Sequence, residues 1–115
     1  MKLSAHFALD ELLRSEYAAR NSIDMTPPKE VVENLSRLAN DVLEPIRLKI
    51  KTAIFITSGY RPLTLNAAIG GALNSAHTKG LAVDCRAVGL SLEEFGRQVR
   101  ALVPVLPIAK VILEF

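Results

Sequence analysis

The stretch "SAHTKGLAVDCRA", residues 75–87, decides the expected fold because a loop, a glycine and a strand-like segment follow one another in it. Residues 81–87 are mostly apolar, which predicts a buried strand. Asp84 nevertheless stands within this segment, and a buried carboxylate requires a compensating partner. His77, one of two histidines in the chain, precedes it by seven residues. These two residue types are the ones a metal site uses.

Zinc accepts imidazole nitrogen and carboxylate oxygen, usually from three protein ligands when the metal is catalytic, with a further position left for water. Gly80, between His77 and Asp84, would let the backbone fold close to a metal. The same spacing also fits a loop histidine near an aspartate that bonds to neighbouring backbone. Spacing alone leaves both interpretations open.

Hydrophobic periodicity predicts a small α+β domain of four helical segments and three strands. The expected helices are a short one within residues 6–21, a long one over 29–49, a short one over 63–71 and one over 91–103. The expected strands span residues 53–60, 81–87 and 109–115. Pro45 falls inside the long helix and should kink it or end it early. Ser91 and Glu94 form a capping-box pattern at the start of the last helix.

Composition narrows the class of protein. The 115 residues fit a single domain, and 50% hydrophobic with 23% charged residues is typical of a soluble globular chain. The net charge is +2 and the basic residues are scattered, so no nucleic-acid partner is expected. Cys85 is the single cysteine, which excludes an intrachain disulfide and predicts a buried core thiol. No signal-peptide pattern and no membrane-length apolar run occur, which predicts cytoplasmic synthesis and no membrane partner.

Two motifs together resemble a known family. "ITSGYRP", residues 56–62, and "SAHTKGLAVD", residues 75–84, are joined by "HFALDELLRS" near the start and "LEPIR" in the long helix. This arrangement resembles the zinc D-Ala-D-Ala carboxypeptidases, which belong with the L-alanyl-D-glutamate endopeptidases of phage lysins and the vancomycin-resistance dipeptidases. The similarity runs from Leu3 to Phe115 and is greatest to the short phage and prophage branch. The residues that match the family's combined motif are Ser75, His77, Gly80, Ala82 and Asp84.

The resemblance implies a fold, a cofactor and residue roles. The fold would be the hedgehog/DD-peptidase type, a small antiparallel sheet with helices packed on one side. His77 and Asp84 would bind zinc, and Arg61 would be the catalytic arginine that stabilises negative charge at the scissile carbonyl. Ser75 and Tyr60 would bind the substrate, a stem peptide of bacterial peptidoglycan. The alternatives are a turn arginine, a loop-stabilising hydroxyl and a packing tyrosine.

The sequence departs from the family at its end. Members carry a third zinc ligand, a histidine, and an acidic general base in a W-x-H-like segment after the last strand. This sequence ends at "VILEF", and His6 matches an N-terminal pattern in which the histidine is not a ligand. We therefore expect the domain, residues 1–115, to lack that final segment, with a weakened zinc site and little hydrolysis.

Two further expectations follow from this departure. The alternative to an enzyme is a non-catalytic cell-wall-binding or phage structural module of the same fold. The apolar strand over residues 109–115 would be uncovered, which predicts a homodimer joined there. A bacterial or phage-encoded origin, with action in the periplasm or cell wall, is implied by the resemblance.

Overall fold

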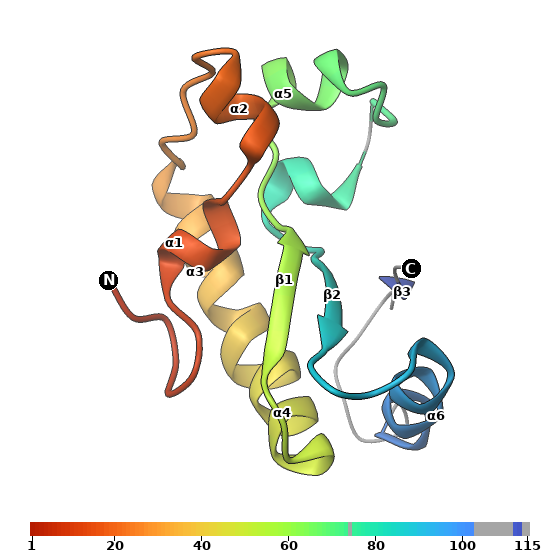
Figure 1. The fold of residues 1–115 in the computed structure, drawn as a ribbon. Helices are drawn as coiled ribbons and strands as arrows, with labels where there is room; N and C mark the ends of the chain where they lie inside the picture. The colour runs from red at the N-terminus through yellow and green to blue at the C-terminus, as the bar shows by residue number, and fades with distance from the viewer. Residues whose placement is uncertain (74, 103–111, 114–115) are drawn as a thin grey trace.

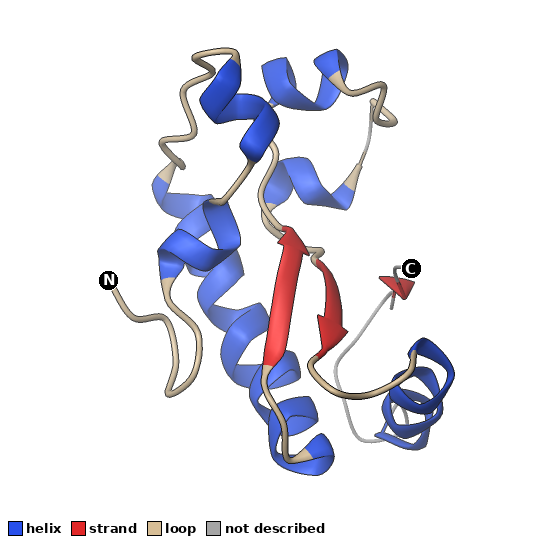
Figure 2. Ribbon diagram, in the orientation of Figure 1, coloured by secondary structure: helices blue, strands red, loops and turns tan. Residues whose placement is uncertain are grey.

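The computed structural model describes residues 1–73, 75–102 and 112–113. Helices α1 to α6 and strands β1 to β3 follow one another in the order that Figure 1 shows. The helices surround a small sheet, which Figure 2 marks in red. Across the described residues, no helix is both long and apolar enough to cross a membrane.

The sheet has the order β1-β2-β3. Strand β1 (Ile54–Ser58) pairs antiparallel with β2 (Asp84–Ala87), and β3 (Ile112–Leu113) pairs parallel with β2. The α+β class is confirmed, but the expected antiparallel arrangement is wrong for the third strand. Helix α6 (Leu92–Leu102) lies between β2 and β3 in the chain, and a helical crossover returns the chain in the parallel direction.

The ends of the predicted last strand lie outside the described residues, which include only Ile112–Leu113 of residues 109–115. The homodimer contact predicted for that segment therefore lies outside them too. In the described part of the chain, β3 has one neighbour, β2.

A long helical rod runs behind β1 in Figure 1. It consists of α3 (Lys29–Leu38), a π-helical turn η1 (Ala39–Leu43) and α4 (Glu44–Ile50). The helix predicted over residues 29–49 is confirmed, and it does not end at Pro45. A proline cannot donate the backbone hydrogen bond of a regular helix, and the π turn directly before α4 is where the rod departs from α geometry.

The core lies between one face of the sheet and these helices. Side chains of a strand alternate between its faces, and Ile54, Ile56, Cys85 and Ala87 are buried while Phe55 is exposed. Buried residues of the helices complete the same cluster, among them Leu12, Leu35, Ala39, Leu43, Ile46, Phe95 and Val99. The predicted core position of the Cys85 thiol is confirmed.

The N-terminal segment forms two helices where one was predicted. Helix α1 (Leu9–Leu13) ends at Arg14, and α2 (Glu16–Arg20) begins after Ser15. The Ser15 hydroxyl accepts a hydrogen bond from the backbone N–H of Ala18 at 3.1 Å. Serine is favoured at such N-terminal caps, and this cap separates the two helices.

The remaining predicted elements are present but shorter. Helix α5 spans Leu63–Ala68, and a 3₁₀ turn, η2, spans Ala76–Lys79. Strand β2 begins at Asp84, so the apolar residues 81–83 belong to the loop before it. The Ser91 hydroxyl accepts a hydrogen bond from the Glu94 backbone at 3.1 Å, which supplies one half of the predicted capping box.

Candidate metal centre

Three hydrogen bonds join the loop after β1 to the turn that carries His77. The backbone N–H of Arg61 donates to the His77 carbonyl oxygen at 3.0 Å. The imidazole Nδ1 of His77 lies 2.8 Å from the Gly59 carbonyl oxygen, and the Arg61 guanidinium donates to the Ser75 hydroxyl at 3.1 Å. The motifs at residues 56–62 and 75–84 are therefore joined into one structural unit.

The bond to Gly59 fixes the tautomer of His77. A carbonyl oxygen only accepts, so Nδ1 must carry the proton. In the neutral imidazole the other nitrogen, Nε2, then has a free lone pair. This is the arrangement in which a histidine binds a metal through Nε2 while a backbone carbonyl holds its other nitrogen. The side chain is only 4% exposed, so its orientation is held by packing as well.

Asp84 presents a carboxylate to that nitrogen. Its Oδ1 lies 3.5 Å from His77 Nε2, and this buried oxygen has no hydrogen-bond partner among the residues that the structure describes. With neutral His77, a lone pair would face a carboxylate oxygen, which is unfavourable unless a cation lies between them. That cation can be a proton on Nε2 or a metal ion. The geometry therefore calls for positive charge at this point.

The donor spacing fits a zinc ion. Zinc bonds to nitrogen and oxygen are about 2.0–2.2 Å long, so two ligands at a tetrahedral angle lie about 3.3–3.5 Å apart. The observed separation of Nε2 and Oδ1 is 3.5 Å. Within the described ranges no group of three or more His, Cys, Asp or Glu residues could hold a metal ion. His77 and Asp84 thus supply two donors of suitable type and spacing.

Two glycines allow the loops to reach these positions. A Cβ on Gly59 would lie 2.2 Å from the Leu12 carbonyl oxygen, so only glycine fits against α1 there. Gly80 ends η2 with φ +73°, and a Cβ on it would meet Val31 at 3.0 Å. Gly80 was predicted to let the backbone approach a metal. In the structure Gly80 lies close to Val31 of helix α3.

Helix α3 also holds the turn by a polar contact. The side chain of Asn34, which is buried, donates to the Lys79 carbonyl oxygen at 2.9 Å. A second contact fixes the start of β2, because the Thr57 hydroxyl donates to the Asp84 carbonyl oxygen at 3.0 Å. Neither contact was predicted, since the partners are 45 and 27 residues apart and no short-range pattern links them.

Arg61 and Ser75 lie beside the pair. The Ser75 hydroxyl accepts from both the Arg61 guanidinium and the His77 backbone N–H, the latter at 3.2 Å, so it caps η2. The Nε of Arg61 is buried and has no hydrogen-bond partner in the described part of the chain. Ser75 thus makes contacts that stabilise the loop, and Arg61 retains one donor without a partner among the described residues.

A cavity of about 250 Å³ has Arg61 in its wall. Tyr60 and Arg61 line it together with Leu65 and Ile69, from α5 and the residue after it. Only 6% of Tyr60 is exposed. Burial raises the pKa of its phenol, and the negative charge of Asp24 raises that pKa further. His77 and Asp84 do not line this cavity, so Arg61 is the predicted site residue that connects the two features.

The other side of the cavity was not predicted from the sequence. It is lined by Phe55 on β1 and by three residues at the junction of α1 and α2, which are Arg14, Ser15 and Glu16. Arg14, Ser15 and Glu16 belong to a segment that was predicted to be one continuous short helix. The break at Ser15 is what brings them to the cavity, and a serine inside a helical pattern was the signal for it.

Comparison with known proteins supplies the family. No curated protein and no solved structure matches the chain. A family model described as peptidase M15 matches residues 5–105. This range contains both motifs, with the loop after β1 and the turn that carries His77. A match over that much of the chain shows membership, and the protein belongs to the peptidase M15 family.

Proposed function

We propose that the protein is a zinc-dependent peptidase that hydrolyses peptide bonds in the stem peptides of bacterial peptidoglycan. One observation carries the proposal: His77 Nε2 faces Asp84 Oδ1 at 3.5 Å, while Nδ1 is hydrogen-bonded to the Gly59 carbonyl oxygen. Membership of the peptidase M15 family supports the reaction class. A bacterial or phage-encoded origin and action at the cell wall belong to the same proposal.

His77 and Asp84 would hold the zinc ion through Nε2 and Oδ1. When bound, the ion supplies a water of lowered pKa and polarises the carbonyl of the scissile bond. The chain's own residues bind and orient the substrate. The Arg61 guanidinium would donate to the oxygen on which negative charge develops, and Ser75 keeps that guanidinium in place.

The cavity beside Arg61 would take the peptide segment that flanks the scissile bond. Its wall combines Leu65 and Ile69 with the Tyr60 ring and the polar residues near α2. Small-molecule sites are typically of this kind, mainly apolar with a few oriented polar groups. A tyrosine hydroxyl is protonated at neutral pH, and burial raises the pKa of Tyr60 further, so this hydroxyl can donate a hydrogen bond to the substrate.

Turnover is expected to be slow. The described residues supply two metal donors, and a complete catalytic zinc site commonly uses three protein ligands. We therefore propose weak hydrolysis, with a non-catalytic cell-wall-binding or phage structural module of the same fold as the alternative.

Metal binding tests the proposal directly. The chain is freed of metal with a chelator and titrated with zinc by calorimetry near neutral pH. His77→Gln and Asp84→Asn should each weaken binding at least about tenfold, because each replaces a strong zinc ligand by a neutral amide. His6→Gln is the control, since His6 contacts Glu44 away from the site. Zinc binding that is unchanged in both site variants would refute the metal assignment.

Hydrolysis tests the reaction class. Wild-type chain and Asp84→Asn are incubated with a synthetic stem pentapeptide and zinc, and products are separated by mass. Cleavage by the wild type that Asp84→Asn abolishes supports the peptidase. Zinc binding together with stem-peptide binding, and no cleavage over days, supports the non-catalytic module.

A further inference from the structure

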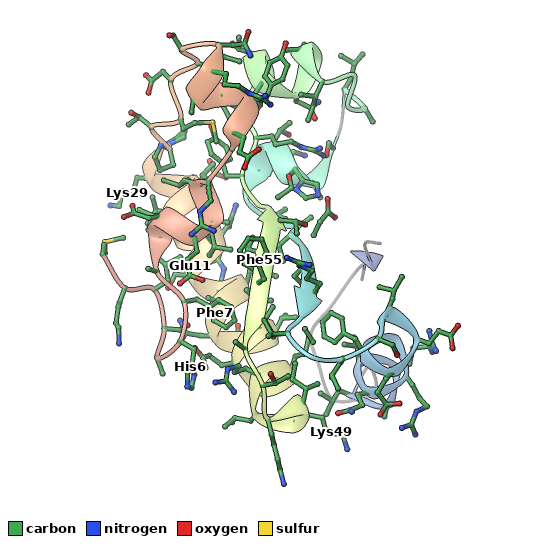
Figure 3. The ribbon with its side chains drawn as sticks, viewed as in Figure 1. His6, Phe7, Glu11, Lys29, Lys49 and Phe55 are labelled. Atoms are coloured by element: carbon green, nitrogen blue, oxygen red, sulfur yellow. The ribbon has the colours of Figure 1, made fainter. Side chains whose placement is uncertain are left out.

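The exposed face of the sheet carries an aromatic ring between two cations. The Arg86 guanidinium carbon lies 5.0 Å from the centre of the Phe55 ring, and that of Arg14 lies 5.7 Å from it. Phe55 is 40% exposed, and Figure 3 shows it on β1 in the middle of the molecule. We call Arg14, Phe55 and Arg86 the arginine shelf.

The shelf adjoins the candidate metal centre through strand β2. Asp84 and Arg86 are two residues apart on this strand, so their side chains point to the same face about 7 Å apart along it. Phe55 and Arg86 are directly opposite one another in the register of β1 and β2. The shelf therefore continues the face on which Asp84 presents its carboxylate.

The shelf also adjoins Arg61 through the cavity. Arg14 and Phe55 line the same 250 Å³ space as Arg61, and Glu16 is the one acidic side chain among its lining residues. No ion pair to Arg14 or Arg86 occurs among the residues that the structure describes. Positive charge thus exceeds negative charge along a path from the shelf to Arg61.

A guanidinium stacked on an aromatic face keeps its N–H edge available. Stacking restricts the side chain, so less conformational entropy is lost when that edge binds a carboxylate. Peptidoglycan stem peptides carry free carboxylates beside their peptide bonds, on γ-linked glutamate and on diamino acids. Charge complementarity therefore favours an acidic peptide over a neutral one.

We infer that the arginine shelf binds a free carboxylate of the stem peptide and so fixes which peptide bond reaches the His77–Asp84 pair. This inference rests on the proposed function, because it assigns the substrate of the same site. Glu16 would act in the opposite direction and repel that carboxylate from the cavity wall.

Side-chain NMR of the arginines tests the inference without any turnover. The metal-free protein, residues 1–115, is titrated with a synthetic stem tripeptide that has free carboxylates, and with the same peptide fully amidated. The Nε–Hε signals of Arg14 and Arg86 should shift with the acidic peptide only. The double variant Arg14→Gln/Arg86→Gln should bind the acidic peptide about 5- to 20-fold more weakly.

Two further variants sharpen the test. Glu16→Gln should bind the acidic peptide about two- to fivefold more tightly, because it removes a repelling charge. Lys49→Gln, on α4 far from Phe55 in Figure 3, removes the same charge as one arginine change and should alter affinity less than about twofold. All these positions are exposed, so the variants should fold normally.

The outcomes separate this inference from the proposed function. If the wild type binds neither peptide, the proposed function fails and the substrate assignment fails with it. If the wild type binds both peptides and the double variant binds them equally well, the inference about the shelf alone is overturned. Shifts of Arg14 and Arg86 with a glycerol-phosphate oligomer, and not with the acidic peptide, would also overturn it in favour of a phosphate polymer.

Discussion

The carbonyl oxygen of Gly59 accepts a hydrogen bond from Nδ1 of His77 at 2.8 Å across 18 residues of sequence. One backbone group thereby sets the protonation pattern of the imidazole and aims Nε2 at Asp84. The loop directly after β1, which supplies this carbonyl, therefore belongs to the candidate metal centre together with His77 and Asp84. Perturbing it should affect folding and metal binding together.

Gly59→Ala should reduce both stability and zinc affinity. The new Cβ would lie 2.2 Å from the Leu12 carbonyl oxygen, so α1 or the loop must shift. Overpacking of this kind typically costs about 1–3 kcal/mol in free energy of unfolding. Urea denaturation of the variant and the wild type would measure this difference. The shift would also move the carbonyl that orients His77, so calorimetry should show weaker zinc binding.

Gly70→Ala is the matched comparison for that variant. Nothing lies within 4 Å of a Cβ at Gly70, although its φ of +77° strains an alanine. It should cost about 1–2 kcal/mol through backbone strain alone and leave zinc affinity unchanged. Equal zinc affinity in Gly59→Ala and the wild type would contradict the role of the Gly59 carbonyl.

Asp84→Asn should stabilise the metal-free chain while it weakens metal binding. Asp84 Oδ1 is buried without a hydrogen-bond partner among the described residues, and burying a carboxylate oxygen without hydrogen bonds destabilises the fold. Removing the charge should raise the free energy of unfolding by about 0.5–2 kcal/mol without metal. Thermal unfolding with chelator and with excess zinc measures the two effects. A lower melting temperature in chelator would show that Asp84 is a structural residue.

The sequence was most informative where one segment specifies its own structure. The strand at Ile54–Ser58 and the long helix follow from local periodicity, and His77 with Asp84 was chosen from a short motif. Contacts between distant segments were not predictable in this way. The fit of Gly59 against Leu12 and the bond from Asn34 to Lys79 depend on tertiary packing.

Local chemistry also competed with periodicity at specific points. Ser15 caps α2 and breaks the helix that the apolar pattern predicted. Pro45 was expected to kink or end the rod, and a π turn before it lets the helix continue. The direction of β3 depends on a crossover, which residue patterns within the strand do not reveal.

Arg61→Lys should lower hydrolysis of a stem peptide more than it lowers binding. The Arg61 guanidinium donates to Ser75 and keeps an Nε donor that has no partner among the described residues. Lysine keeps the positive charge but lacks this planar fork of donors. Losing one oriented donor to a developing oxyanion costs about 10²–10³-fold in kcat. Ser75→Ala should cost less, because the guanidinium stays but loses one support. Equal kcat in Arg61→Lys and the wild type would leave Arg61 as a turn residue.

Glu44→Gln should weaken the attachment of the N-terminal loop to the helical rod and change the acid stability of the protein. The Glu44 carboxylate accepts hydrogen bonds from the Ser4 hydroxyl, from the His6 backbone at 2.7 Å and from the His6 ring at 2.6 Å. Burial alone would raise the pKa of Glu44, but the bonds from Ser4 and His6 outweigh it, and the pKa lies below its ordinary value of 4.5. A carboxyl whose pKa is lowered by folding stabilises the protein above its unfolded-state pKa. That stabilisation is lost as the pH falls through the lower, folded-state value.

The wild type should therefore lose free energy of unfolding below about pH 4.5, and Glu44→Gln should show a shallower loss there. At pH 7 the variant should be less stable by about 1–2 kcal/mol, since hydrogen bonds to a charged acceptor are replaced by weaker ones. Urea denaturation from pH 3 to pH 7 measures both effects. Glu93→Gln, an exposed position on α6, is the control and should follow the wild-type curve. Parallel curves for Glu44→Gln and the wild type across this range would show that the bonds to Ser4 and His6 do not stabilise the fold.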